Sequence, residues 1–171
     1  MRVLETDRLV LRRLTFDDAA FIVDLLNQPS FLQHIGDRGV RTLDDARAYL
    51  ENGPMASYEA NGFGLWLTEL KATDVPIGMC GLLKRDTLAH ADVGFAFLPA
   101  FWGQGYAAES AAAVLAYGRT TLGLGRIVAI TSPGNAGSMR VLEKIGMKFE
   151  RMIGMGGEDR DVRLFGPDPL R

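Results

Sequence analysis

Cysteine, histidine and long hydrophobic runs are what this sequence has least of. Its 171 residues contain one cysteine, Cys80, and two histidines, His34 and His90. A single cysteine excludes an internal disulfide and suits a reducing compartment, so we expect a cytoplasmic protein with a packed thiol. Because the histidines are far apart and no cysteine cluster accompanies them, we expect no metal site. No segment approaches 18 uninterrupted apolar residues, so we expect no membrane span.

An excess of either charge is also missing. The chain has 19 basic and 21 acidic residues, for a net charge of -2. Proteins that hold nucleic acid or an anionic membrane usually carry a basic excess, so neither partner is expected. The length suits one domain, which would bury roughly 70% of the surface of its unfolded chain. Since no linker or repeat divides the sequence, we expect a single domain over residues 1–171.

The most informative segment that is present runs from Ala91 to Ala107. It begins as a strand of alternating apolar residues and ends in Gly103-Gln104-Gly105, just before an alanine-rich helical stretch. A glycine turn before a helix presents unpaired backbone N–H groups and the positive end of the helix dipole. We therefore expect an anionic cofactor to bind here through a phosphate or pyrophosphate, although many such turns bind nothing.

The same glycines permit a second interpretation, because Gly103, Gly105 and Ala108 fit the dinucleotide-binding pattern G-x-G-x-x-G/A. That pattern needs an acidic residue about 20 positions later, at the end of the next strand. The next apolar run, residues 126–131, is followed by Ser132-Pro133 and contains no Asp or Glu. A nucleotide-binding oxidoreductase is therefore disfavoured but stays an alternative.

Hydrophobic periodicity and turn residues predict a mixed α/β chain. The expected strands are residues 2–14, 63–70, 76–83, 92–98, 126–131, 148–153 and 161–165. The expected helices are residues 15–26, 42–51, 104–121 and 135–145, with a loop over 28–41. This order predicts a mainly antiparallel sheet of about seven strands flanked by about four helices. The fourth and fifth strands, which a helix joins, should be parallel and able to splay apart.

Three segments resemble the GNAT acetyltransferase superfamily, particularly its branch that includes ribosomal-protein N-terminal acetyltransferases. They read LETDRLVLRRLTFDD, VGFAFLPAFWGQGYAAE and NAGSMRVLEKIGMKFE. The resemblance covers nearly the whole chain and implies a GNAT-like fold, acetyl-CoA as acetyl donor, and direct transfer to a primary amine in a ternary complex. The acceptor would be a small molecule or a protein N-terminus, and the protein a monomer or homodimer. A non-catalytic acyl-CoA-binding regulatory module on the same fold is the alternative.

The resemblance also assigns cofactor contacts to the strand end, the glycine turn and the late helix. These residues are Phe97, Leu98, Trp102, Gly103, Gln104, Gly105, Tyr106, Ala107, Asn135, Ser138 and Arg140. The turn would bind the pyrophosphate through its backbone N–H groups. The backbone of Phe97 and Leu98 would pair with the pantetheine arm like an added strand. Asn135 would hydrogen-bond the pantetheine, and Arg140 would meet a CoA phosphate.

Catalysis requires a neutral amine, so some group must remove a proton directly or through water. Asp92 is the first candidate base, because relatives often carry Glu on this strand, and an exposed strand-end aspartate is the alternative. Glu109 is the second candidate, with a helix-stabilising role as its alternative. Ser138 is the candidate acid for the leaving thiolate, since Leu142 stands where many relatives have tyrosine. An ordinary first-turn serine is the alternative for Ser138.

Acceptor recognition is assigned by the resemblance to the first two helices, to the loop between them at residues 33–38, and to the last hairpin. Asp37 in that loop is expected to attract a cationic amine. The sequence does not decide between a protein N-terminus, an amino acid, a polyamine and an aminoglycoside.

Overall fold

The computed structural model describes residues 1–155 and 161–169. Its strands are β1 (Arg2–Glu5), β2 (Leu9–Arg13), β3 (Leu65–Leu70), β4 (Pro76–Leu83), β5 (Asp92–Phe97), β6 (Ala129–Thr131), β7 (Met147–Gly154) and β8 (Asp161–Pro167). Its α-helices are α1 (Ala19–Leu26), α2 (Pro29–His34), α3 (Leu43–Leu50), α4 (Ala56–Asn61), α5 (Tyr106–Thr120) and α6 (Ala136–Lys144). Short 3-10 helices lie at η1 (Phe16–Asp18) and η3 (Pro99–Phe101), and a π-helix lies at η2 (Glu51–Met55).

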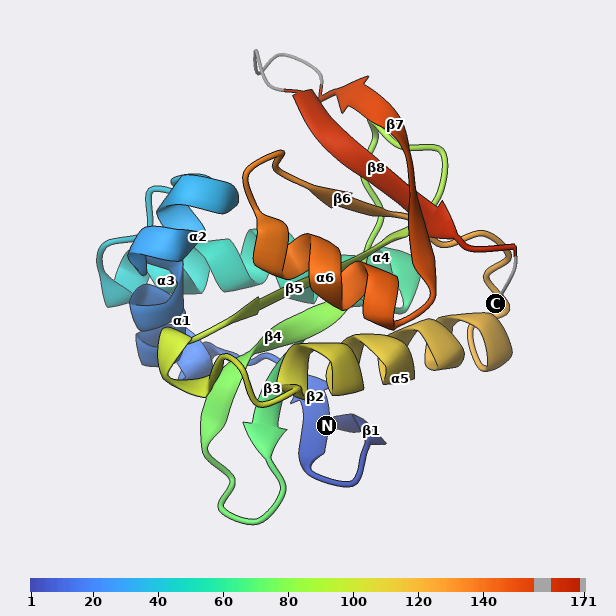
Figure 1. Ribbon diagram of the computed structural model, residues 1–171. Coiled ribbons are helices and arrows are strands. Elements are labelled where there is room, and N and C mark those ends of the chain that lie inside the picture. The colour runs from blue at the N-terminus through green and yellow to red at the C-terminus, as the bar shows by residue number, and fades with distance from the viewer. Residues whose placement is uncertain (156–160, 170–171) are drawn as a thin grey trace.

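The strands form two antiparallel sheets that meet at one point. The first has the order β1-β2-β3-β4-β5 and the second the order β6-β8-β7. β5 and β6 run parallel and join where Asp92 lies opposite Val128. There the Val93 N–H donates to the Val128 carbonyl at 2.9 Å, and the Val128 N–H donates to the Ala91 carbonyl at 3.0 Å. The two strands diverge from this point (Figure 1), which confirms the expected parallel, splayed pair.

Helices cover both faces of the first sheet, with α5 and α6 in front of the strands and α3 and α4 behind them in Figure 1. Trp66 and Leu67 are consecutive in β3, so their side chains point to opposite faces. Trp66 belongs to the core under α5, together with Val114 and Leu115, whereas Leu67 belongs to the core formed with α1 and α3. Burying each side chain of this size stabilises the fold by roughly 1.5–3 kcal/mol. The predicted fold class is confirmed.

The first expected strand, residues 2–14, is instead the hairpin of β1 and β2. The Thr6 N–H donates to the Leu9 carbonyl at 2.9 Å, and the Thr6 hydroxyl accepts from the Leu9 N–H at 3.1 Å. The polar triplet Thr6-Asp7-Arg8 therefore makes a turn that the alternating pattern concealed. This turn raises the strand number above the seven expected, and it places Arg8 beside the start of α5.

Two further helical segments were not expected. Residues 28–41 contain α2, where Pro29 occupies the first helical position, for which its fixed φ is well suited. The helix expected to end near Glu51 continues through η2, which accommodates Pro54, and through α4. It ends at Gly62, whose φ of +76° terminates the helix in the left-handed conformation. Both additions line the cavity described next.

Candidate active site

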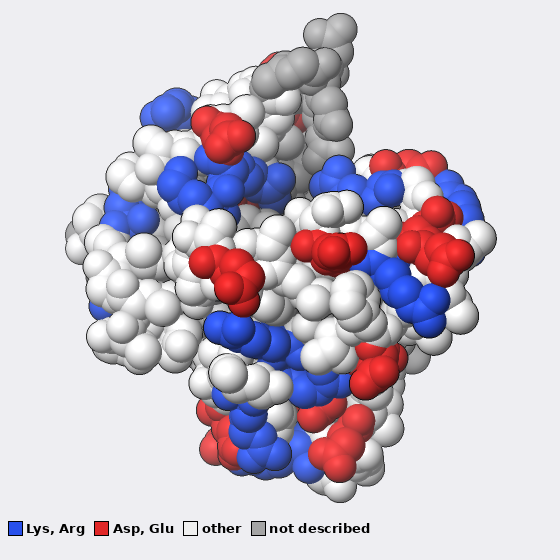
Figure 2. Space-filling model, turned by 180° about the vertical axis from the view of Figure 1, so that it is seen from behind, with Lys and Arg blue, Asp and Glu red and all other residues white. Residues whose placement is uncertain are grey.

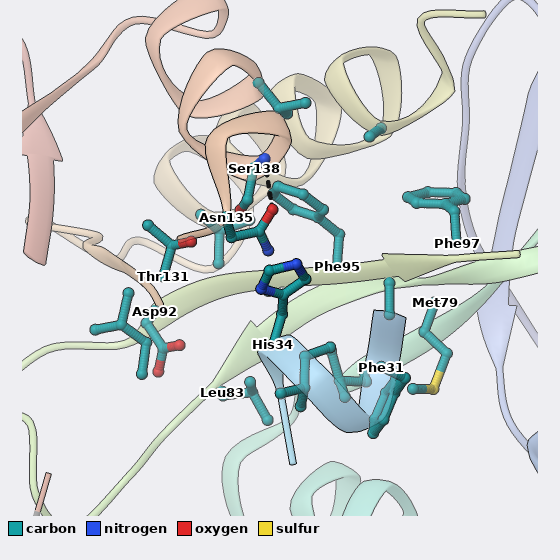
Figure 3. A pocket seen from close by; sticks show the side chains of 18 of the residues that line it. Phe31, His34, Met79, Leu83, Asp92, Phe95, Phe97, Thr131, Asn135 and Ser138 are labelled. Carbon is teal, nitrogen blue, oxygen red and sulfur yellow. Dashed lines mark hydrogen bonds between the residues drawn. The ribbon is translucent and has the colours of Figure 1, made fainter. Parts of the chain in front are cut away.

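A cavity of about 1190 Å³ opens where β5 and β6 diverge. Its walls come from β5, the turn before α5, the first turns of α6, and the helices α2 to α4. Figure 3 shows Asp92 and Phe97 near opposite ends of β5, with Asn135 and Ser138 on the α6 side and His34 and Phe31 on the α2 side. Ligand sites commonly enclose about 300–1,000 Å³, so the cavity has room for an extended ligand and a second reactant.

The N-terminus of α5 opens into this cavity without a side-chain cap. Gly103 and Gly105 have φ values of +75° and +84°, a conformation that side chains disfavour. Gly105 is the N-cap residue, and no side chain of the described residues caps the helix. The first backbone N–H groups of α5 are therefore left for an external acceptor. A Cβ at Gly103 would meet no atom within 4 Å, so the surface beside the turn is open.

Arg8 holds this turn from the outside. Its Nη1 donates to the Gln104 carbonyl at 2.9 Å, and its guanidinium carbon lies 4.4 Å from the centre of the Tyr106 ring. Its Nε donates to the Glu109 carboxylate at 2.7 Å, and its backbone N–H donates to the same carboxylate at 3.1 Å. Sequence reasoning did not select Arg8, because its partners lie about a hundred positions away.

The carboxylate of Glu109 is engaged in these hydrogen bonds from Arg8. Its carboxylate also accepts from the Thr6 hydroxyl at 2.5 Å. Burial would raise the pKa of Glu109, but the hydrogen bonds from Thr6 and Arg8 outweigh it, and the pKa is lowered. Glu109 is also absent from the residues that line the cavity. The geometry therefore favours the helix-stabilising role over the role of second candidate base.

Backbone groups of β5 face the gap toward β6 at alternate residues. Because the Val93 N–H points to Val128, the polar groups of Phe95 and Phe97 point the same way. Leu98 does not take part, since its N–H donates to the Ile77 carbonyl and its carbonyl accepts from Phe101, each at 2.9 Å. The expectation that Leu98 pairs with a pantetheine arm is corrected on this ground.

Trp102 occupies part of the same strand edge. Its indole Nε1 donates to the Phe97 carbonyl at 2.9 Å, although the residue is 53% exposed. The indole thereby fixes the path of the chain between β5 and the glycine turn. The Phe97 N–H and the polar groups of Phe95 are the strand groups that still face the gap.

The N-terminus of α6, in contrast with that of α5, is capped. The Asn135 Oδ1 accepts from the Ser138 N–H at 3.1 Å, an interaction drawn in Figure 3. Among the described residues, the Asn135 Nδ2 and the Ser138 hydroxyl have no hydrogen-bond partner, and both residues line the cavity. Arg140, one turn from Asn135, is exposed at the cavity wall. Each of these residues is thus positioned to meet a ligand.

Asp92 is buried at the floor of the cavity, with 1% of its side chain exposed. Its Oδ1 accepts from the Nε of Arg85 at 3.1 Å. Burial raises the pKa of Asp92, while Arg85 acts in the opposite direction. The alternative of an exposed strand-end aspartate is therefore wrong. A buried carboxylate with a raised pKa is a stronger proton acceptor than an ordinary aspartate.

Two side chains at this end were not assigned a role from the sequence. His34 ends α2, and its Nδ1 lies 3.1 Å from the Ser132 hydroxyl after β6, so the pair bridges two walls of the cavity. Arg85 follows β4 and reaches Asp92 across the sheet edge. No local pattern signals the contact of His34, because it joins segments 98 positions apart. Arg85 and Asp92 are seven positions apart, and the pairing of β4 with β5 brings them together.

Asp37 does not line the cavity. Its carboxylate accepts from the Arg41 Nη2 at 2.7 Å in an exposed ion pair. The expectation that Asp37 draws a cationic amine into the site is therefore corrected. Cys80 is buried, as expected, and burial raises the pKa of its thiol to about 12.

Comparison with known proteins decides the family. Residues 8–148 match the family model of the acetyltransferase (GNAT) domain. This chain belongs to the GNAT acetyltransferases. It is 33% identical to the uncharacterised protein YkkB of Bacillus subtilis (strain 168) over 153 residues, which cover 88% of this chain and 87% of YkkB. It is 30% identical to the uncharacterised N-acetyltransferase YoaA of the same organism over 152 residues, which cover 88% and 85%.

The fold of this GNAT chain also matches solved structures. RimL, a ribosomal L7/L12 α-N-protein acetyltransferase solved in complex with coenzyme A, aligns with a TM-score of 0.82 and 16% identity over 98% of both chains. The resemblance to the GNAT superfamily is thereby confirmed, and the alignment with RimL shows the shared fold. Within residues 1–155 and 161–169, no helix is long and apolar enough to cross a bilayer. The same residues contain no group of three or more His, Cys, Asp or Glu that could hold a metal ion.

Proposed function

We propose that this GNAT chain is a single-domain N-acetyltransferase that moves the acetyl group of acetyl-CoA to a primary amine by direct transfer. The observation that carries the proposal is the uncapped N-terminus of α5, which opens into a cavity that continues to the buried Asp92. An anion-binding end and a proton-accepting end in one cavity are what transfer from an anionic thioester to an amine requires.

The turn before α5 fits a pyrophosphate. Gly103, Gln104, Gly105, Tyr106 and Ala107 would supply backbone N–H groups, aided by the positive end of the helix dipole. Arg8 keeps the Gln104 carbonyl turned outward, because it donates a hydrogen bond to that oxygen. Carbonyl repulsion of the phosphates is thereby reduced.

Phe95 and Phe97 would pair with the pantetheine arm, because their backbone groups face the gap between β5 and β6. The Asn135 Nδ2 would donate to a pantetheine carbonyl while its Oδ1 continues to cap α6. Arg140 would meet a phosphate at the exposed cavity wall. Trp102 would border the arm while it holds the Phe97 carbonyl.

Acetyl-CoA would supply the acetyl group as a thioester. Asp92 would take a proton from the acceptor amine, through a water where the distance requires one, as the amine nitrogen bonds to the thioester carbon. Ser138 would donate a proton to the sulfur as the carbon–sulfur bond breaks. Asp92 gains one proton and Ser138 loses one, so solvent exchange restores both groups before the next turnover.

The test is to follow thiol release with acetyl-CoA and a panel of primary amines. A ligand that binds only the folded state raises the melting temperature, so CoA alone should stabilise the protein. An unchanged melting curve at millimolar CoA would contradict the cofactor assignment. CoA binding without thiol release on any amine would instead favour the non-catalytic regulatory module.

A further inference from the structure

The charged side chains that line the cavity are mostly basic. Among the described residues, Asp92 is the single carboxylate in the lining. The basic lining residues are Arg38 from the segment after α2, Lys84 and Arg85 from the segment after β4, and two further cations from α6. The back face of the molecule in Figure 2 mixes both signs of charge, and the whole chain has a net charge of -2. The basic excess inside the cavity is therefore a local feature.

The positive charges of Arg38 and Arg85 both act on the hydroxyl of Tyr49. Both lower the pKa of the half-buried Tyr49 hydroxyl, although burial raises that pKa overall. Arg38 comes from the segment after α2, Tyr49 from α3 and Arg85 from the segment after β4. Arg38, Tyr49 and Arg85 thus line the same cavity from three separate segments, and Arg85 contacts Asp92.

Most of the hydrogen-bonding capacity of these arginines is unused within the described residues. Arg85 gives its Nε to Asp92, and neither of its terminal nitrogens has a described partner. Arg38 makes no described hydrogen bond or ion pair. Lys84 differs, because its ammonium donates to the carbonyls of Arg85 and Leu88. The free forks of Arg38 and Arg85 have the geometry that binds a carboxylate.

We propose that the acceptor is an amine that carries a carboxylate a few bonds away, bound by Arg38 and Arg85 while its nitrogen faces Asp92. This inference rests on the proposed acetyl transfer. Nearby positive charge lowers the pKa of an amine, so the same arginines favour the neutral, nucleophilic form. Polyamines and aminoglycosides are disfavoured acceptors, because their additional cations would enter a basic cavity with one carboxylate that is already paired.

Free amino acids and peptides with an acidic N-terminal residue share this chemistry. The experiment compares kcat/KM for thiol release with four acceptor types. These are α-amino acids, the matching α-amino amides, short peptides beginning with Asp or Asn, and spermidine. Higher rates for the amino acids than for their amides identify a free amino acid, whereas higher rates for Asp peptides than for Asn peptides identify an N-terminus. Spermidine acetylated as fast as the best carboxylate acceptor would overturn the proposal.

Arg38→Gln tests the residue assignment. Hydrogen bonds to charged groups contribute enough that kcat/KM for the carboxylate acceptor should fall about 10- to 100-fold. The rate with the matching uncharged acceptor should fall much less, so that the preference for the carboxylate acceptor is what Arg38→Gln removes. Arg38→Lys should restore part of the loss. Arg47→Gln is the matched control, because Arg47 is exposed on α3, pairs with Asp44 and does not line the cavity. Equal losses for charged and uncharged acceptors in Arg38→Gln would overturn the assignment.

The carboxylate preference can be tested separately from the proposed acetyl transfer. If CoA binds and no amine releases thiol, calorimetric titration of the CoA-saturated protein with the same acceptors still tests the carboxylate preference. Binding of the carboxylate amine that Arg38→Gln weakens would support the site without catalysis. Equal binding of a carboxylate amine and its amide would overturn it.

Discussion

The two ends of the cavity are built from different parts of the chain. At the end that begins α5, the uncapped polar groups belong mainly to the backbone, and they come from one short turn at residues 103–107. At the end around Asp92, the polar groups that line the cavity belong to side chains from α2, the segment after it, α3 and the segment after β4. A backbone site depends on conformation and tolerates many side chains, whereas a side-chain site changes with each substitution. Under the proposed function, this difference would let a shared cofactor end accompany varied acceptor ends.

The largest expected effect lies at the backbone end. Gly105→Val should abolish detectable CoA binding, because its side chain enters the turn, and its Cβ would lie 3.3 Å from the Arg8 Nη2. The φ of +84° adds strain of roughly 1–3 kcal/mol. Gly123→Val is the matched control, since its φ is +68° and a Cβ there meets nothing within 4 Å. Calorimetric CoA titration should give no binding for the first variant and wild-type affinity for the second. Normal affinity in Gly105→Val would remove the turn from the phosphate site.

The next largest effect is expected on kcat at Asp92, in the end of the cavity that is built from side chains. Asp92→Asn should lower kcat by roughly 10²-fold, because general bases contribute at least that much. A base works when it is ionised, so the wild-type rate should fall as the pH drops through the pKa of Asp92. Burial raises that pKa, so this fall should lie above the ordinary value of 3.8. The variant should bind CoA normally and lose this acidic limb in a pH–rate profile. A preserved limb would exclude Asp92 as the base.

A smaller effect is expected at Ser138, between the two ends. Ser138→Ala keeps the backbone N–H that Asn135 caps, so α6 should stay intact. Loss of a proton donor acts in the transition state, and kcat should fall about tenfold or more with little change in CoA affinity. Steady-state kinetics with a single acceptor measure both quantities. A wild-type kcat would return Ser138 to the role of an ordinary first-turn serine.

The smallest effect concerns the support of the turn. Glu109→Gln should lower the free energy of unfolding at neutral pH by about 1–2 kcal/mol, because hydrogen bonds from Thr6 and Arg8 are weakened. The pKa of Glu109 is lowered from 4.5, so its contribution is present above that pH and is lost as the pH falls through the folded-state value. Urea unfolding at pH 7 and at decreasing acidic pH checks the trend, with the exposed Glu59→Gln as control. A difference that does not shrink in acid would contradict the ion-pair explanation.

The sequence predicted the geometry of the glycine turn and of the α6 cap better than the contacts around Asp92, for a physical reason. Two glycines beside a helix start are a local signal, and their positive φ values follow from nearest-neighbour sterics. The same applies to Asn135, whose cap involves a residue three positions away. Contacts such as that between His34 and Ser132 join distant segments, and no periodicity encodes them.

In the fold, too, the elements set by local patterns were predicted and those set by distant contacts were missed. The alternating strands of the central sheet and the helical spacing of α5 were predicted because burial imposes a regular period. The turn at Thr6-Asp7-Arg8 was missed because its register follows from pairing with other strands. α2 was missed because residues 28–41 were predicted to form a loop, although proline, here Pro29, suits the first position of a helix.

The contact between Arg8 and Glu109 has a consequence for the order of folding. The two residues are 101 positions apart, so their contact closes a loop that contains β2, β3, β4 and β5. Long loops close late, because closing them costs more chain entropy than closing short ones. During synthesis, the glycine turn would gain its external support only after about 110 residues had left the ribosome and the first sheet had paired. Binding of CoA during refolding should therefore follow formation of the first sheet, and the rate of CoA capture would report when the amino-terminal hairpin docks.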